Sequence, residues 1–187
     1  HPERFSKTIF AEMRGVSDAE GNSPFWQWLQ EHFFSIDFTL ADYLTGIGKK
    51  GFIADLMPKL PIYVNLLSKE AQAVIGEVHD NTRPALKLLE REGFTNRGYV
   101  DIFDAGPTVE CDLRNIESVR HAIRAQVQIA EHSSSKDFLI GNTSFENFRA
   151  VAAKGAYDQA SDTVILSSEV ASALEVKEGE FVRMLAQ

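Results

Sequence analysis

The side chain best suited to acid–base chemistry in this sequence is His79, which ends the run GEVH at residues 76–79. Histidine can give and take protons because its ordinary pKa lies close to neutral pH. The pattern predicts a strand over residues 74–79 that leads into a polar loop, and such junctions often carry functional groups. On that strand Glu77 shares a face with His79 and could tune the imidazole or act as a base, whereas Asp80 points to the opposite face. A structural histidine and a plain surface carboxylate are the competing interpretations.

The remaining histidines and the single cysteine are weaker candidates. His32 lies among aromatic residues on a predicted helix, and His121 and His132 lie on or just beyond another helix, where they are expected to be packed or solvated. Cys111 alternates with apolar residues in a predicted strand, which favours a buried structural thiol over a nucleophile. The spacing of His, Cys, Asp and Glu resembles no metal site, so we expect no metal.

The composition indicates a globular protein that can bury a core. Of the 187 residues, 44% are hydrophobic and 25% are charged. A formal net charge of -8 argues against nucleic acid, whose phosphates attract Lys and Arg. The apolar runs are too short to span a membrane, and one cysteine suits a reducing cytoplasm. Because a strand-like run follows His1 almost at once, we interpret the chain as a piece of a longer protein.

Two segments in the first two thirds of the chain share a strand–loop–helix plan. A strand over residues 8–14 precedes a helix that Ser23 caps and Pro24 opens. The strand at 74–79 precedes a helix that Pro84 opens and that ends at Gly93, which suits a left-handed C-cap. We interpret the pair as a duplicated element, with chance similarity as the alternative. Two further short helices are predicted at 39–46, begun by a capping box of Thr39 and Asp42, and at 68–73. Two strands are predicted at 99–104 and 108–113.

The last third of the chain has a different texture. A helix is predicted over residues 116–130, and the polar run 132–136 is the clearest linker. Short strands then follow around a helix at 169–174, a pattern typical of a small β-rich barrel. The predicted strands cover 138–140, 148–151, 163–166 and 181–185. We therefore predict two domains, residues 1–135 and 136–187.

Several motifs together resemble one enzyme family. They are FAEMRG (10–15), SPFW (23–26), FFSIDF (33–38), FIADLMPKLPIY (52–63), EAQAVIGEVH (70–79) and DIFDAGPTVECD (101–112). The run from Gly76 to Phe94 resembles the later half of the GNAT acyltransferase fold, and the whole set resembles the arginine N-succinyltransferases, in their carboxy-terminal half. The resemblance implies an α+β fold, with a GNAT-like mixed sheet and flanking helices, followed by the barrel-like tail.

The resemblance also implies an activity and a set of site residues. The family transfers succinyl from succinyl-CoA, a co-substrate rather than a bound cofactor, to the α-amine of L-arginine in arginine catabolism. Its catalytic histidine, a proton donor, falls on His79. A guanidinium needs carboxylates and a carboxylate needs a cation, so the expected substrate-binding residues are acidic or basic positions near the strands. These residues are Glu12, Arg14, Glu77, Asp101 and Glu110.

The CoA contacts stay unassigned because no Gly-rich phosphate loop precedes a helix, and residues 46–51 suit a solvated turn better. Family resemblance implies assembly of more than one chain. Two alternatives remain open. One is a binding or assembly module that is inactive without the missing amino-terminal half, and the other is an acyltransferase for ornithine or another amine.

Overall fold

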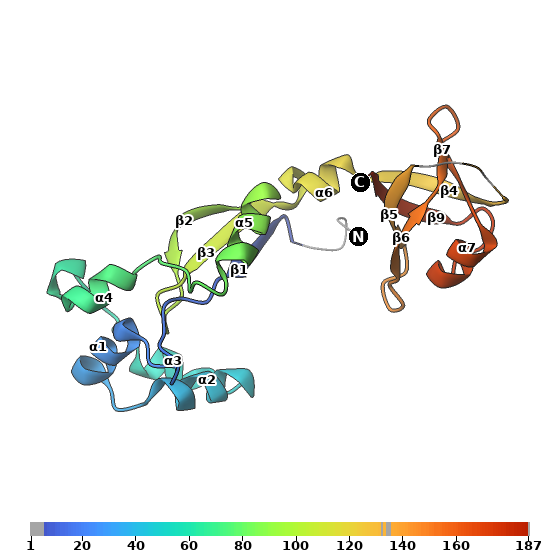
Figure 1. Ribbon diagram of the computed structural model, residues 1–187. Helices are drawn as coiled ribbons and strands as arrows, with labels where there is room; N and C mark the ends of the chain where they lie inside the picture. Colours follow the sequence, from blue (N-terminus) through green and yellow to red (C-terminus); the bar gives the residue numbers. More distant parts are fainter. Residues whose placement is uncertain (1–5, 132, 134–135, 187) are drawn as a thin grey trace. The chain divides into compact units, whose positions relative to one another are not determined.

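The computed structural model describes residues 6–131, 133 and 136–186 (Figure 1). They form two compact units. The N-terminal unit is Thr8–Asp112, and the C-terminal unit comprises the described residues from Leu113 onward together with Ser6 and Lys7. Both units contain helices and strands, which confirms the predicted α+β class.

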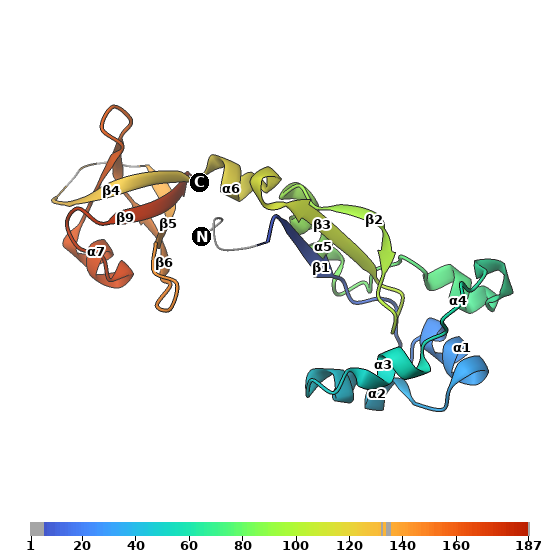
Figure 2. The same cartoon turned by 180° about the vertical axis from the view of Figure 1, so that it is seen from behind.

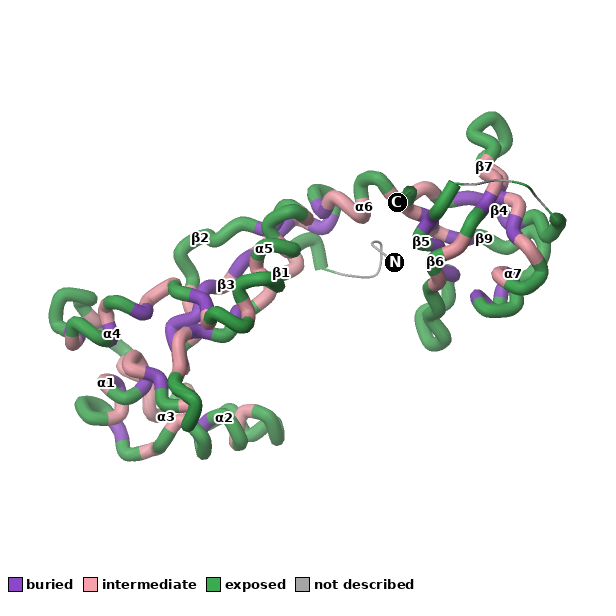
Figure 3. The backbone as a smooth tube through the Cα atoms, viewed as in Figure 1, coloured by how far each residue is buried: buried purple, intermediate pink, exposed green. Residues whose placement is uncertain are grey.

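The N-terminal unit is built on an antiparallel sheet with the strand order β1-β3-β2. Its strands are β1 (Thr8–Glu12), β2 (Thr95–Val100) and β3 (Pro107–Asp112). Side chains of the central strand β3 alternate between buried and half-buried, as its period-two pattern predicted. Figure 3 shows the buried stretch along β3. Glu12 pairs with Thr108, so β1 ends beside the turn that leads into β3.

A tight turn between β2 and β3 replaces most of the strand predicted at residues 99–104. Strand β2 ends at Val100, and the carboxylate of Asp101 then accepts hydrogen bonds from the N–H groups of Phe103 at 2.7 Å and Asp104 at 3.3 Å. An aspartate that bonds the backbone two residues on stabilises a turn rather than a strand. Ala105 completes the reversal with a positive φ of 56°.

Three short helices follow β1, and the capping of the second helix determines where Asp42 lies. The helices are α1 (Pro24–Phe33), α2 (Phe38–Gly46) and α3 (Gly51–Leu56). Ser23 caps α1 as predicted, since its hydroxyl accepts the backbone N–H three residues on at 3.4 Å. Helix α2 is capped by Asp37, whose carboxylate accepts an N–H at 2.8 Å, so the predicted capping box of Thr39 and Asp42 is wrong. Asp42 lies inside the helix instead.

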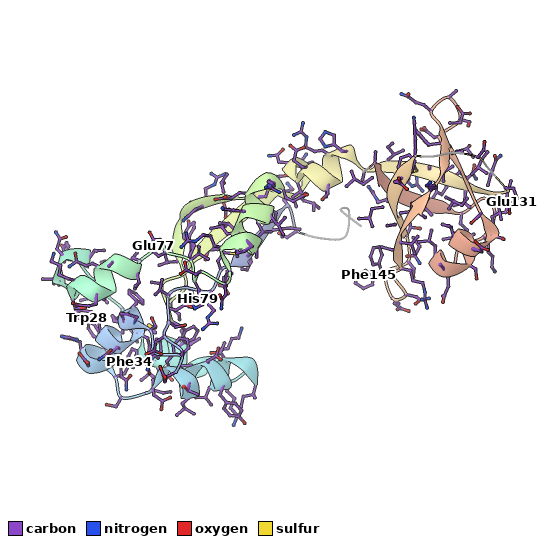
Figure 4. All side chains as sticks on the ribbon, viewed as in Figure 1. Trp28, Phe34, Glu77, His79, Glu131 and Phe145 are labelled. Carbon is purple, nitrogen blue, oxygen red and sulfur yellow. The ribbon has the colours of Figure 1, made fainter. Side chains whose placement is uncertain are left out.

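Aromatic side chains form the core between these helices and the β2–β3 turn. Trp26 is only 1% exposed, and its ring centroid lies 5.0 Å from that of Phe34 and 5.1 Å from that of Phe103. Phe103 belongs to the turn, so the same core fixes α1 and the turn against each other. Figure 4 labels Trp28 on α1 and Phe34 at the end of this helix.

The strand predicted at residues 74–79 is wrong. Val74 is the last residue of α4 (Lys69–Val74), which Ser68 caps as predicted by accepting an N–H at 3.1 Å. Gly76 then turns the chain with a φ of 76°, and only Val78 forms an isolated bridge, with Gly15. The N-terminal unit therefore does not repeat a strand–helix plan.

Two further helical segments surround this region. They are the 3-10 helix η2 (Val64–Leu66) and α5 (Arg83–Arg91), which has a proline in its first turn and is followed by Gly93 at a φ of 96°. The predicted left-handed C-cap is confirmed there.

The C-terminal unit is a six-stranded sheet in the order β6-β5-β9-β4-β8-β7, with parallel pairing only between β4 and β8. The view from behind in Figure 2 shows β4 beside β9. Its strands are β4 (Ile123–Ile129), β5 (Asp137–Asn142), β6 (Ala150–Lys154), β7 (Ala156–Asp158), β8 (Thr163–Leu166) and β9 (Phe181–Ala186). Its helices are η3 (Leu113–Asn115), α6 (Glu117–His121) and α7 (Ser168–Leu174).

The helix predicted at residues 116–130 is wrong beyond His121. Ala125 and Val127 are buried while the residues between and around them are exposed, which is the alternation of a strand. The apolar positions of β4 fit both periods, and pairing with β8 and β9 selects the strand. The tail sheet therefore starts before residue 136, where the sequence placed the second domain. Part of the predicted linker at 132–136 lies outside the described residues. No helix in the described part of the chain is long and apolar enough to cross a membrane.

Candidate active site

His79 lies in the segment between α4 and α5, which is held on both sides by backbone hydrogen bonds. The His79 N–H donates to the carbonyl of Arg14, two residues after the end of β1, at 2.9 Å. The Gly76 N–H donates to the carbonyl of Ala105 at 2.8 Å, in the β2–β3 turn. The segment is thus fixed although it is not a strand. Figure 4 shows Glu77 and His79 on this connection.

One hydrogen bond assigns the two nitrogens of the His79 ring. Nδ1 accepts the backbone N–H of Asn81 at 3.2 Å. A neutral imidazole that accepts at Nδ1 carries its proton on Nε2. Asp80 takes no part in orienting the ring, because its carboxylate pairs with Arg83 at 2.9 Å, and this hydrogen bond lowers the pKa of Asp80. His79 is half-buried and presents an N–H donor.

A pocket of about 490 Å³ has Arg14 in its lining, the residue whose carbonyl binds the His79 N–H. The end of β1, the loop after it, helix α2 and the β2–β3 turn form its walls. Its lining residues are Glu12, Met13, Arg14, Ser17, Gly21, Phe38, Asp42, Thr45, Asp101, Phe103 and Asp104. Arg14 connects the pocket with the histidine, since it lines the pocket and its carbonyl binds the His79 N–H.

Carboxylates outnumber the single guanidinium in this pocket. Burial raises the pKa of Asp101, and the charges of Asp104 and Glu12 raise it further, against the lowering effect of the turn hydrogen bonds. The Arg14 guanidinium donates to the hydroxyl of Ser17 at 2.9 Å. The pocket therefore offers a surplus of negative charge for a cation and one guanidinium for an anion.

The structure brings together some of the predicted site residues and separates others. Glu12, Arg14 and Asp101 line the same pocket, although the first two are far from the third in sequence. Glu77 is exposed in the segment of His79 and does not line the pocket. Glu110 lies on β3, outside the pocket lining, and pairs with Arg97 at 3.3 Å.

Sequence reasoning missed the wall that α2 supplies. Asp42 and Thr45 are one helical turn apart and both line the pocket. The capping-box interpretation placed Asp42 at the start of the helix, which concealed it as a pocket residue. The signal that could have found it is Asp37, an equally good N-cap four residues after Phe33, which places Asp42 inside the helix.

The other candidate nucleophiles and bases have structural surroundings. His32 stacks on Trp28 at a centroid distance of 4.3 Å, and His121 pairs with Glu117 at 3.1 Å. Burial raises the pKa of the Cys111 thiol, which keeps it protonated and unreactive. His132 lies outside the described residues. Among the residues that the structure describes, no group of three or more His, Cys, Asp and Glu could hold a metal ion.

Comparison with known proteins gives a consistent result along the whole chain. Residues 1–118 match the family described as arginine N-succinyltransferase beta subunit, and residues 123–186 match the C-terminal domain of that subunit. An arginine N-succinyltransferase of Escherichia coli (strain 55989 / EAEC) is 47% identical over 98% of this chain, and one of Photorhabdus laumondii is 47% identical over 97%.

A solved structure extends the similarity to the fold. The arginine/ornithine succinyltransferase subunit AI from Pseudomonas aeruginosa matches all of this chain with a TM-score of 0.81 and 36% sequence identity. This chain covers 53% of that structure and 53% of each of the two curated relatives. It therefore spans about half the length of the proteins it matches.

Proposed function

This chain belongs to the arginine N-succinyltransferase family, and from that premise we propose that it supplies the arginine pocket and the acid for succinyl transfer. In the proposed reaction a succinyl group moves from succinyl-CoA to the α-amine of L-arginine. The observation that carries the proposal is the carboxylate-rich pocket, which shares Arg14 with the segment that holds His79.

The pocket's charges suit the charges of arginine. A guanidinium presents N–H donors in a plane and is bound best by carboxylates, which Glu12, Asp42 and Asp101 provide. The α-carboxylate of the substrate needs a cation, and Arg14 is the guanidinium in the pocket wall. Phe38 and Phe103 line the pocket beside these groups and suit the methylene chain between the two charged ends.

The reaction needs one proton removed and one supplied. The neutral α-amine attacks the thioester carbonyl, a C–N bond forms, the C–S bond breaks, and the sulfur leaves as a thiolate that takes up a proton. His79 presents an N–H at Nε2, which we assign to the leaving sulfur. Glu77, exposed two residues earlier, is the carboxylate that we assign to receive the proton of the amine.

Succinyl-CoA enters this proposal as a co-substrate, and its binding site is not assigned to residues of this chain. We also propose that the chain works in an assembly of more than one chain. The names of the matched family and of the Pseudomonas aeruginosa structure, each of which contains the word subunit, support this. The single buried cysteine supports a reducing cytoplasm as the place of action.

A second amine calls for a parallel test. The name of the Pseudomonas aeruginosa protein contains ornithine beside arginine. Ornithine carries an ammonium where arginine carries a guanidinium, and the same carboxylates could bind either cation. A pure assembly role is the other alternative, and it is favoured by the half-length match to the curated relatives.

A thiol-release assay tests the proposal. Succinyl-CoA and arginine are supplied to this chain alone and to this chain joined behind the amino-terminal half of the Escherichia coli relative. We expect turnover in the joined form and little or none in the chain alone. Faster turnover with ornithine than with arginine would identify ornithine as the substrate. Absence of turnover in both forms of the protein with every amine would leave only the assembly role.

A further inference from the structure

We propose that Asp104 is a positioning residue that fixes the His79 segment against the pocket through the backbone. Asp104 lies in the β2–β3 turn and is 8% exposed. It is an acidic residue that none of the site assignments above uses as a ligand. The inference rests on the proposed function in giving His79 its role, but the geometry below does not depend on the reaction.

Both oxygens of the Asp104 carboxylate are committed to backbone donors. Oδ2 accepts the N–H of Gly15 at 2.7 Å, and Oδ1 accepts the N–H of Gly106 at 2.9 Å. Hydrogen bonds of this kind to a carboxylate are short and about twice as strong as neutral ones. A single side chain therefore ties Gly15, three residues after the end of β1, to Gly106, the residue before β3.

Residues at or next to the two tied glycines bond the His79 segment. Gly15 forms the bridge with Val78, and its neighbour Arg14 accepts the His79 N–H at 2.9 Å. Ala105, between Asp104 and Gly106, accepts the Gly76 N–H at 2.8 Å. The carboxylate thus lies at the centre of a junction that holds both ends of the four-residue run ending at His79.

The junction is packed so closely that two of its positions require glycine. A Cβ on Gly15 would lie 2.4 Å from the carbonyl oxygen of Asp104 and 2.6 Å from its Oδ1. A Cβ on Gly106 would lie 2.0 Å from the carbonyl oxygen of Met13. Such contacts force backbone movement, so these glycines allow the close approach that the carboxylate needs. This precision suits a device that positions a side chain within a fraction of an ångström.

The role of Asp104 differs from that of the other pocket carboxylates. Asp104 lines the pocket, but the backbone N–H groups occupy both of its oxygens, whereas Asp42 projects from a helix. Removing Asp104 leaves two N–H groups without their acceptor in a buried place, and the chain must move to satisfy them. The expected consequence is a loosened His79 segment with the rest of the sheet intact.

Two NMR measurements on the whole chain test the positioning role of Asp104 without an activity assay. They are hydrogen exchange of the backbone amides and the chemical shifts of the two His79 ring nitrogens. In Asp104→Asn we expect the amides of Gly15, Gly76 and His79 to exchange at least about tenfold faster, because a charge-assisted hydrogen bond corresponds to that factor or more. The amides of β3 should keep their rates. The Nδ1 and Nε2 shifts of His79 should move toward each other as the Asn81 bond loosens and the tautomers mix.

A matched control and a measurement on the unaltered chain complete the test. Asp158→Asn changes an exposed aspartate that also accepts a backbone N–H in a turn, at 3.0 Å, and should leave His79 unchanged. If Asp104→Asn does not fold, native-state hydrogen exchange of the unaltered chain provides the test. The backbone amides of Gly15, Gly106 and His79 should then exchange through one shared opening, with the same free energy of opening. Separate opening of His79, unchanged His79 signals in Asp104→Asn, or equal acceleration across all of β3 would overturn the proposal.

Discussion

At the scale of single residues, Nε2 is the His79 nitrogen that can present a proton to the leaving sulfur. In the resting chain Nδ1 accepts the Asn81 N–H at 3.2 Å, so the neutral ring carries its proton on Nε2. Giving that proton away from the neutral ring would leave an imidazolate, so the proposed proton donor is the ring protonated on both nitrogens, in which Nδ1 no longer accepts the Asn81 N–H. An amine base and a thiolate acid need different groups, and we assign His79 to the thiolate.

His79→Gln is expected to lower kcat by about a hundredfold or more while changing the arginine KM little, because general acid catalysis typically contributes that much. The measurement is the thiol-release assay at saturating succinyl-CoA, in whichever form of the protein shows turnover. The control is His121→Gln, which removes an exposed histidine that pairs with Glu117 and should keep kcat. A kcat close to that of the unaltered protein would rule out His79 as the acid.

Asp42→Asn is expected to raise the arginine KM by about tenfold with kcat within about twofold, since it removes one charge-assisted contact from the pocket. Asp55→Asn is the matched control, because Asp55 is an exposed aspartate on the neighbouring helix α3 and does not line the pocket. Steady-state kinetics with arginine as the varied substrate give the answer. An effect on kcat alone would show that Asp42 acts on chemistry rather than on binding.

Asp101 should make the free energy of unfolding depend on pH in an unusual direction. Burial raises its pKa above 3.8, so between that value and the raised pKa the folded chain holds a proton that the unfolded chain has released. The stabilisation that Asp101 contributes is therefore fully present below pH 3.8 and is lost as the pH rises through the raised pKa. Asp101→Asn keeps an acceptor oxygen and removes the titration.

Denaturant unfolding of both proteins at a series of pH values checks this. The unfolding free energy of the unaltered chain minus that of Asp101→Asn should fall across the window just above 3.8. Comparing the two proteins cancels the opposite contributions of Asp18, Asp80 and Asp158, whose pKa values are lowered. A flat difference would contradict the assigned effect of burial.

At the scale of elements, capping of α2 determines which side chains reach the pocket. Asp37→Ala should lower the free energy of unfolding by about 1 kcal/mol, the usual cost of a lost N-cap. Thr39→Ala is the control and should cost much less, because the structure gives the cap to Asp37. Chemical denaturation followed by circular dichroism measures both. Equal losses of unfolding free energy in the two variants would contradict the assignment of the cap to Asp37 and favour the capping box predicted from the sequence.

The elements also show how far local pattern predicts this fold. Strand β3 and helices α1, α4 and α7 have signals within their own residues, namely alternation or a capping serine, and they were predicted. The apolar residues of β4 fit a helix and a strand equally, and only its pairing with β8 and β9 decides. The strand expected before His79 failed because Val74 belongs to the preceding helix.

In the candidate site, too, local pattern predicted individual residues but not their arrangement in space. The histidine stood out through its residue type and the motif around it, and Glu12, Arg14 and Asp101 through charge on predicted strands. Their convergence on one pocket could not be read locally, because the pocket joins β1, α2 and the β2–β3 turn. Asp104 shows the same limit: its partners Gly15 and Gly106 lie 89 and 2 residues away, and the long-range bond defines its role.

At the scale of the whole molecule, each unit has a core drawn from its own residues. One core contains Leu29 and the aromatic residues around Trp26, and the other contains Leu174 with strands β4, β5, β8 and β9. Cores that share no side chains can unfold in separate steps. We therefore expect calorimetry of the whole chain to show two transitions.

Matched substitutions assign the two transitions. Leu174 is 0% exposed and Leu29 is 3% exposed, so Leu→Ala at either position should cost about 2–5 kcal/mol. Leu174→Ala should lower the melting temperature of one transition and leave the other in place, and Leu29→Ala should do the reverse. A single transition that moves with both substitutions would mean that the two cores stabilise each other, and the pocket would then depend on the tail for its stability.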